Sequence, residues 1–346
     1  YLDDTSKLHA GAATNGWQAG VAKTNITPKQ PMWMSGYASR NKPATGKLTD
    51  LWAKALALQD DQGDRFVLIT LDLVGIDRSL SQEICGRLSD EYGLSRSAIA
   101  LCVSHTHTGP IVGDNLSTMA HNLDADQRQR IDQYARDLVD AVVKVSGEAI
   151  ADLEPATLAR CQGAADFAVN RRNNREADVP QLREEGRLRG PVDHDVPVLA
   201  VRDSSGRLKA LAFGYACHAT TLSFYEWSGD WPGFAQIEIE RRQTHAMAVL
   251  PRRSVELAQK YGTMIADAVD RALAAGVESV PPDVATRYEE IPLAFGELPT
   301  REELLDEAKS KDPYVAARAQ SLLGELESDG SLADTYPYPV QIATLG

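Results

Sequence analysis

Three histidines stand where apolar runs end, and their side chains could bind a metal there. His105 and His107 follow the apolar run of residues 98–104, and His218 ends a second run that begins at Leu208. Side chains two apart in an extended segment share a face, so His105 and His107 would point to one place. Imidazole is the commonest protein ligand for zinc, and a catalytic zinc takes about three protein ligands and a water. The pattern indicates a metal site, and the alternative is a set of hydrogen-bonded loop histidines without a metal.

Other charged side chains lie close enough in sequence to join such a site. Asp230, in a tight turn over residues 228–233, could orient a ligand or the attacking water. Arg171 lies nearest the preceding strand in the polar stretch 170–191, so it is the member that we expect to reach a pocket. Asp72 lies inside an apolar run, where an unpaired carboxylate is costly. It would therefore either support a histidine or cap the next helix.

Small residues near these positions have simpler interpretations. Gly36, followed by Tyr37, could let the backbone approach a ligand closely, although ordinary core packing is the interpretation that we favour. The four cysteines are scattered, without the spacing of a zinc ribbon or a disulfide framework. Cys102 and Cys217 lie an odd number of positions from His105 and His218, so we expect them to pack on the opposite face and do not count them as ligands.

The elements that must position the histidines are those of an α/β fold, with mixed sheets flanked by helices in a single large domain. Strand-like runs cover residues 17–27, 51–59 and 65–74, with a hairpin turn at 60–64. An amphipathic helix over 79–92 and the strand at 98–104 complete a strand, helix, strand unit. Sites in such folds gather at the carboxyl ends of strands. We therefore expect the metal site at those ends.

The second half of the chain continues the alternation of helices and strands. We expect strands over 158–168, 195–202 and 208–218, the last running up to His218. Apolar residues at helical spacing predict helices over 127–148 and 254–276. A further helix over 234–241 would direct its N-terminus at the site. Thr300 and Glu303 form a capping box that opens a charged helical segment toward Leu323.

Composition excludes several function classes. A formal net charge of -13 leaves no basic stripe for a nucleic acid, and no apolar run approaches the roughly 20 residues that cross a bilayer. The sequence lacks the glycine-rich loops of dinucleotide and nucleotide-triphosphate sites and the nucleophile elbow of serine hydrolases. It begins with Tyr1 and no signal segment follows, so we expect a processed or trimmed product that is secreted or periplasmic.

Five segments together resemble the catalytic domain of the neutral ceramidase family, and they are residues 20–28, 34–37, 104–110, 170–171 and 215–220. Members of that family are zinc amidases, usually secreted or at membrane surfaces, that cleave the N-acyl bond of ceramide. The resemblance implies that His105 and His218 bind zinc. It also implies that His107 is a catalytic histidine beside the metal and that Arg171 contacts the substrate.

The resemblance covers residues 17–276 and also sets the expected domain boundaries. The family completes its zinc shell with a glutamate and a tyrosine lying further along than Gly346, and it carries an immunoglobulin-like domain after them. At residues 247–251, relatives resemble a strand and a glycine-rich loop, whereas this sequence runs straight into a helix. We expect a catalytic domain over 17–346, incomplete at its C-terminus, after an extension over residues 1–16.

Three functions remain open on this sequence. The first is zinc-dependent hydrolysis of a ceramide-like N-acyl substrate by a metal-activated water. The second is metal-dependent hydrolysis of small acylated polar compounds, such as modified sugars. The third is a catalytically inactive binding module of the same fold. All three take a small-molecule or lipid partner, without nucleic acid and without a transmembrane segment.

Overall fold

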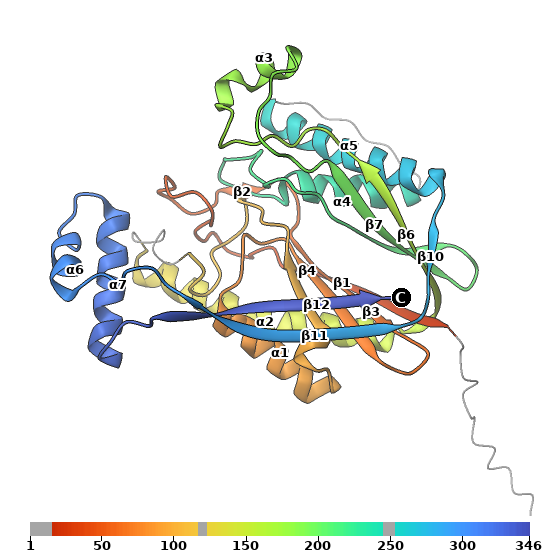
Figure 1. Ribbon diagram of the computed structural model, residues 1–346, viewed down its shortest axis with the longest axis horizontal. Helices are drawn as coiled ribbons and strands as arrows, with labels where there is room; N and C mark the ends of the chain where they lie inside the picture. The colour runs from red at the N-terminus through yellow and green to blue at the C-terminus, as the bar shows by residue number, and fades with distance from the viewer. Residues whose placement is uncertain (1–15, 117–122, 245–252) are drawn as a thin grey trace, which may run out of the picture.

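The main sheet forks into two half-sheets (Figure 1). The computed structural model describes residues 16–116, 123–244 and 253–346. Its strands follow the order β5-β4-β3-β1-β6-β7-β8, with β10 also paired to β6. β1 pairs with β3 from Gln18 to Asn25, but with β6 only from Trp17 to Ala19. Beyond that short contact, β10 takes over the pairing with β6. The strands are β1 Trp17–Asn25, β3 Trp52–Gln59, β4 Arg65–Leu71, β5 Ile99–Val103, β6 Glu154–Ala164, β7 Asp195–Asp203, β8 Leu208–Phe213 and β10 Glu278–Val280.

Helices α1 (Arg78–Tyr92) and α2 (Ala125–Ala151) cover one face of the first half-sheet (Figure 1). The side chain of Asp77 accepts a hydrogen bond from the Leu80 N–H at the start of α1, and Gly93 ends the helix with φ 68°. β4 and β5 run parallel on either side of α1 in the chain, as the strand, helix, strand pattern predicts. The apolar faces of both helices and of the strands form one large core. Its members include Ala55, Ile69, Ile84, Leu138 and Val142.

Helices α4 (Asp230–Thr244) and α5 (Arg253–Ala275) cover the second half-sheet, where a separate core forms. α4 also reaches across to the first half-sheet. The Glu240 carboxylate forms ion pairs with Lys23 of β1 at 3.0 Å and Lys54 of β3 at 2.6 Å. The Gln236 side chain donates to Asp72 at 3.3 Å. α4 therefore lies in the fork and contacts both halves.

A long hairpin of β11 (Val284–Ala294) and β12 (Thr335–Leu345) crosses the first half-sheet and carries two helices at its far end (Figure 1). These helices are α6 (Arg301–Glu307) and α7 (Pro313–Asp329), and the capping box of Thr300 and Glu303 opens α6 as predicted. The hairpin is fastened by the Gln341 side chain, which donates to the carbonyls of Ser97 and Ile99.

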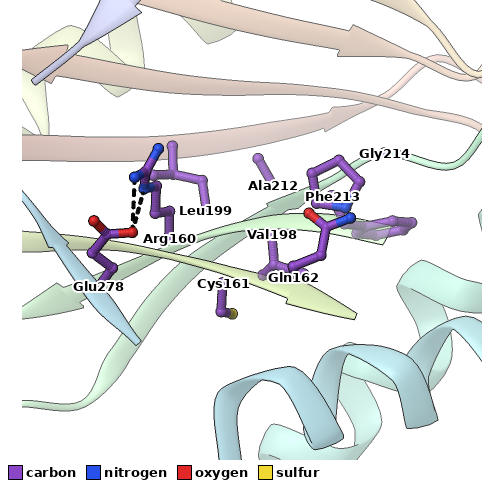
Figure 2. A pocket seen from close by; sticks show the side chains of 10 residues that line it. Arg160, Cys161, Gln162, Val198, Leu199, Ala212, Phe213, Gly214 and Glu278 are labelled. Carbon is purple, nitrogen blue, oxygen red and sulfur yellow. Dashed lines mark hydrogen bonds and ion pairs between the residues drawn. The ribbon is translucent and has the colours of Figure 1, made fainter. Parts of the chain in front are cut away.

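A groove of about 590 Å³ lies on the second half-sheet (Figure 2). Arg160 and Glu278 form an ion pair at 2.8 Å on one side of it, and Phe213 and Gly214 line its other end. None of the three histidines lines this groove. The candidate metal centre is therefore elsewhere in the molecule.

The predicted fold class is confirmed, while several boundaries differ. β8 ends at Phe213, five residues short of His218, because its pairing with β7 ends there. β6 lies four residues earlier than expected, and α4 begins at Asp230 instead of residue 234. The hairpin strands β11 and β12 were not predicted. Residues 1–15 and 247–251 lie outside the described parts. No helix in the described residues is long and apolar enough to cross a membrane.

Small elements complete the chain around the two half-sheets. β2 (Gly46–Lys47) pairs in parallel with β9 (Glu226–Trp227), which brings the loop before β3 against the loop before α4. Short helices lie at η1 (Arg96–Ala98), η3 (Glu176–Asp178) and α3 (Val179–Glu184). The polar stretch 170–191 thus contains helical turns as well as loop.

Candidate metal centre

The imidazoles of His105, His107 and His218 converge where the loop after β5 of the first half-sheet meets the loop after β8 of the second. Their ligand nitrogens all lie within 4.8 Å of one another. The Nε2 atom of His107 is 2.9 Å from that of His218 and 3.4 Å from that of His105. The rings of His105 and His218 stack at 4.6 Å, and His107 stands nearly perpendicular to both. The structure thus brings together all three histidines that the sequence singles out.

His105 is held by the backbone just after β4. Its Nδ1 lies 2.5 Å from the carbonyl oxygen of Val74. A carbonyl can only accept, so Nδ1 carries the proton and the lone pair of His105 is on Nε2, facing the other two rings. His105 also has φ 58°, in the left-handed region. The alternation that we expected for residues 105 and 107 therefore does not apply, and a turn after β5 makes the two rings meet.

His107 is the buried member of the cluster. Its backbone N–H donates to the carbonyl of Ala219, which ties this loop to the loop of His218. Gly36, at φ 94°, faces the ring so closely that a Cβ there would lie 2.5 Å from it. Burial, with further contributions from His218, His105 and Arg40, lowers the pKa of His107 to about 4. The close approach that we considered at Gly36 is thus made to a histidine ring.

His218 lies on an exposed loop whose backbone is fixed by Asp230. One carboxylate oxygen of Asp230 accepts from the Leu222 N–H at 2.8 Å, and the other accepts from the Trp231 N–H at 2.6 Å. The side chain of Trp231 in turn donates to the His218 carbonyl at 3.4 Å. Asp230 is fully buried, and that burial raises its pKa. Burial also lowers the pKa of His218.

Two threonines fasten the histidine loop to the start of α4. The hydroxyls of Thr106 and Thr108 both donate to the carbonyl oxygen of Ser228 at 2.7 Å. The Ser228 N–H donates back to the Thr108 carbonyl at 3.1 Å. Because both threonines are fully buried, these bonds are shielded from water. They fix His107, which lies between them in sequence.

Two other residues from the sequence analysis have different surroundings. Arg171 is half exposed and forms an ion pair with Glu176 at 3.1 Å, and no hydrogen bond joins it to the histidines among the described residues. Asp72 neither caps α1, whose cap is Asp77, nor bonds a histidine. It accepts from the Trp52 N–H at 3.0 Å and from Gln236, and burial raises its pKa. Cys102, expected to be packed, is exposed on the outer strand β5.

Tyr37 and Arg40 are neighbours of the site that the sequence analysis did not assign. The Tyr37 ring meets the edge of His107 at 4.8 Å, and its hydroxyl donates to the Leu222 carbonyl at 3.0 Å. The Arg40 guanidinium lies over the other side of Tyr37, also at 4.8 Å. Burial raises the pKa of Tyr37 to about 12, so it stays a donor at neutral pH. The glycine before Tyr37 was the available signal in the sequence.

The donor set fits a zinc ion. Zinc binds imidazole nitrogen at about 2.0–2.1 Å. The Nε2 atom of His107 is 3.4 Å from that of His105 and 2.9 Å from that of His218, so a zinc held by His105 and His218 would also lie beside His107. Lowered pKa values keep His107 and His218 unprotonated at neutral pH, as ligands must be. The carbonyl behind His105 is the kind of second partner that orients a metal-bound histidine. The cluster can therefore hold a metal through its Nε2 atoms.

Comparison with protein families gives a match to the model described as neutral/alkaline non-lysosomal ceramidase, N-terminal, over residues 17–330. The neutral ceramidase of Mycobacterium tuberculosis is 26% identical over 215 residues, which are 60% of this chain and 33% of that protein. Neutral ceramidase 2 of Arabidopsis thaliana is 26% identical over 210 residues, 59% of this chain and 27% of that protein. The matched part is thus a third or less of these relatives.

The fold resembles that of solved ceramidase structures. The crystal structure of neutral ceramidase from Pseudomonas aeruginosa superposes with a TM-score of 0.69 at 20% identity, over 96% of this chain and 61% of that one. A ceramidase complexed with C2 gives a TM-score of 0.70 at 19% identity, over 96% of this chain and 62% of that one. The forked sheet and its helices are therefore an arrangement shared with these proteins.

Proposed function

The chain belongs to the neutral/alkaline non-lysosomal ceramidase family, and from this premise we propose that it is a zinc-dependent hydrolase of an amide bond in a ceramide-like N-acyl substrate. The observation that carries the proposal is the convergence of three imidazole rings, with their ligand nitrogens within 4.8 Å of one another. A zinc ion bound there would polarise the scissile carbonyl and lower the pKa of its water. A secreted or periplasmic location stays a prediction of the family resemblance.

In this proposal His105 and His218 hold the zinc. Both present Nε2 on exposed loops, where a substrate can reach the metal. His107 stabilises the developing oxyanion or moves a proton at Nε2, beside the two ligands. Its low pKa keeps it neutral across the working pH range. Tyr37, in edge contact with that ring, positions it.

Arg171 and Asp230 have supporting roles in the proposal. Arg171 would contact the substrate, and its present partner Glu176 is close enough to Tyr37 to raise the pKa of that tyrosine. That charge is the last and smallest of the contributions to the pKa of Tyr37, so the role of Arg171 rests on the family resemblance. Asp230 has both oxygens engaged by backbone N–H groups, which supports a role in positioning the loop of His218.

Metal analysis of single variants tests the proposal. We expect the natural full-length protein to bind one zinc per chain and to hydrolyse N-acyl sphingosines, with both properties lost in His105→Ala and His218→Ala. His107→Ala should keep the metal and lose at least about a hundredfold in kcat, because general acid–base groups contribute that much. His194→Ala is the matched control, since His194 is not part of the histidine cluster and its ring lies 3.5 Å from the Ala168 carbonyl. Zinc binding that survives in His105→Ala would contradict the ligand assignment.

A substrate screen separates the remaining functions. The zinc-loaded protein is offered long-chain and short-chain N-acyl sphingosines, N-acetyl sugars and acyl esters under the same conditions. Preference for the long-chain amides supports the ceramidase activity. Turnover confined to the small polar compounds would reject it and leave the zinc mechanism standing. Zinc binding without turnover of any of them would favour a binding module.

A further inference from the structure

Arg40 is a buried cation that no carboxylate neutralises among the described residues. The residue is only 6% exposed, in the loop between β1 and β3. Burial lowers its pKa to about 10, so the guanidinium stays charged at neutral pH. A buried charge is costly unless other contacts offset the cost of leaving water. The groups that surround this guanidinium therefore indicate what the residue does.

Two tyrosine rings and two backbone carbonyls hold the guanidinium. It lies over the rings of Tyr37 and Tyr225, at 4.8 Å and 5.9 Å from their centroids, and the faces of such rings attract a cation. One terminal nitrogen donates to the Ser35 carbonyl, and the other donates to the Phe224 carbonyl at 3.2 Å. The Nε–H is buried without an acceptor. Arg40 thus joins its own loop to a segment that lies 184 residues further along the chain.

The loop of this arginine forms the wall against which the His107 ring lies. The Ser35 N–H donates to the Gly109 carbonyl at 3.0 Å, which holds the loop beside the segment of His107. Gly36 faces the ring so closely that a Cβ there would lie 2.5 Å from it. The Tyr37 ring meets the same imidazole at 4.8 Å between centroids. The guanidinium holds Ser35 and Tyr37, which are the two ends of this wall.

The other segment that Arg40 reaches continues from His218. The Tyr37 hydroxyl donates to the Leu222 carbonyl at 3.0 Å. The Phe224 carbonyl, two residues further on, accepts from the guanidinium. Hydrogen bonds from two neighbouring side chains therefore tie the wall described above to the loop that carries His218. This arrangement can fix the distance between the catalytic histidine and His218, whose Nε2 atoms lie 2.9 Å apart.

We propose that Arg40 is a positioning residue, which acts through Tyr37 to hold His107 in its place beside His218. A guanidinium suits this task because its planar fork donates to two carbonyls while its face stacks on an aromatic ring. An apolar side chain in the same space could do neither. With Tyr37 between the two residues, Arg40 acts on the imidazole from behind that ring. This assignment rests on the proposed function, because it concerns the geometry of that same site.

The kinetics of Arg40→Met test the assignment in the natural full-length protein. Methionine has a similar length but neither an N–H donor nor a charge. We expect kcat per bound zinc to fall at least about tenfold with KM unchanged, because a buried residue moves the catalytic ring without reaching the substrate. Arg183→Met should keep the natural kcat, since the exposed Arg183 also donates to two carbonyls, those of Asp166 and Phe167. A natural kcat in Arg40→Met, or a higher KM alone, would overturn the proposal.

A conservative variant separates positioning from a general loss of stability. Arg40→Lys keeps a cation over the Tyr37 ring and a donor for one carbonyl. We expect its kcat per bound zinc to lie at least about threefold above that of Arg40→Met. Rates expressed per bound zinc are unaffected by a loss of folded protein, which is what a purely structural role would cause. Equal losses in the two variants would show that the cation over Tyr37 does not position the catalytic ring.

NMR measures the position of the ring without turnover and without metal. In the metal-free protein, the proton on the carbon between the two His107 nitrogens reports on the neighbouring rings, and its signal is identified by its absence in His107→Gln. We expect this signal to move in Arg40→Met and to stay in place in Arg183→Met. A moved signal in Arg40→Met, together with no hydrolysis by the natural protein, would support the positioning role and reject the hydrolase. An unmoved signal would refute the positioning role even if the natural protein hydrolyses amides.

Discussion

His107 combines burial with a position between two other imidazoles, and both features disfavour its protonated form. It is 8% exposed, its Nδ1 has no acceptor, and its pKa lies at about 4 instead of 6.5. A histidine that the folded protein keeps neutral couples stability to pH. Above pH 6.5 both the folded and the unfolded chain carry a neutral His107. Below that value the unfolded chain takes up a proton that the folded chain cannot.

We therefore expect the metal-free protein to lose stability through His107 as the pH falls from 6.5 to 4. The loss is at most about 1.4 kcal/mol per pH unit, and it ends near the folded pKa, where the native histidine is protonated too. Denaturant unfolding at several pH values measures it, with His107→Gln as the comparison that removes the titrating group. The free energy of unfolding of the natural protein, relative to that of His107→Gln, should fall as the pH falls. Free energies of unfolding that change equally with pH in the two proteins would contradict the prediction.

The three histidines could be predicted from the sequence, because each follows an apolar run and is of a type that binds metals. Their mutual geometry could not, because it depends on the left-handed backbone at His105 and on the carbonyls of Val74 and Ala219. Arg40 could not be assigned either. Its sequence neighbours are polar, and its burial comes from Tyr225 and Phe224, which lie far along the chain.

Helix α2 lies unusually close to β1, and a glycine makes this possible. A Cβ atom at Gly20 would lie 2.0 Å from the carbonyl oxygen of Ala149 and 2.7 Å from the carbonyl carbon of Asp152. Both atoms belong to the backbone at the end of α2, so a rotamer change cannot relieve the contact. The helix as a whole would have to move away from the sheet. The packing of this layer thus depends on the absence of one methyl group.

Gly20→Ala should lower the free energy of unfolding by about 1–3 kcal/mol, the usual cost of overpacking. Thermal or denaturant unfolding measures the change. Gly86→Ala is the matched control in α1, where no atom lies within 4 Å of the added methyl. That substitution should raise stability by up to about 1 kcal/mol, because alanine loses less entropy in a helix. An unchanged stability in Gly20→Ala would show that α2 can shift at little cost.

Most elements were predictable where one face is apolar along the whole segment, as in α1, α2 and α5. The sequence analysis was wrong for strands whose existence or length depends on pairing with another strand. β8 looks like a longer strand in sequence, yet it ends at Phe213, where its pairing with Val198 of β7 ends. β11 and β12 have mostly exposed side chains, and their paired residues lie from 41 positions apart (Ala294 and Thr335) to 61 positions apart (Val284 and Leu345). Prolines at 292, 337 and 339 further obscure the pattern of a strand.

The β11–β12 hairpin joins the first half-sheet through a turn at the opposite end of the sequence. Asp60, 3% exposed, accepts from the N–H groups of Gln62 and Asp64 within its own turn. Its second oxygen accepts from the Val284 N–H at 2.9 Å, where β11 begins. One carboxylate thus closes the β3–β4 turn and fixes the root of the hairpin.

Asp60→Ala should therefore loosen a region more than 200 residues away. We expect faster amide hydrogen exchange along β11 and β12, with a stability loss of about 1–3 kcal/mol for the N–H groups left unpaired. Exchange measured by mass spectrometry resolves the hairpin from the rest. Asp203→Ala is the control, because Asp203 closes the β7–β8 turn in the same way without contacting the hairpin. Equal exchange in the hairpin of both variants would rule out the connection.

Because the sheet forks, an ion bound by the histidines would connect its two halves. The loop of His105 and His107 follows β5, the outer strand of one half-sheet, while that of His218 follows β8, the outer strand of the other. An ion held by both loops would act as a removable crosslink that closes the stretch of chain from His105 to His218 into a loop. By linkage, a change that separates the two half-sheets must also lower the affinity of the protein for the ion. A substitution far from any ligand would then lower the measured ion affinity if it separates the half-sheets.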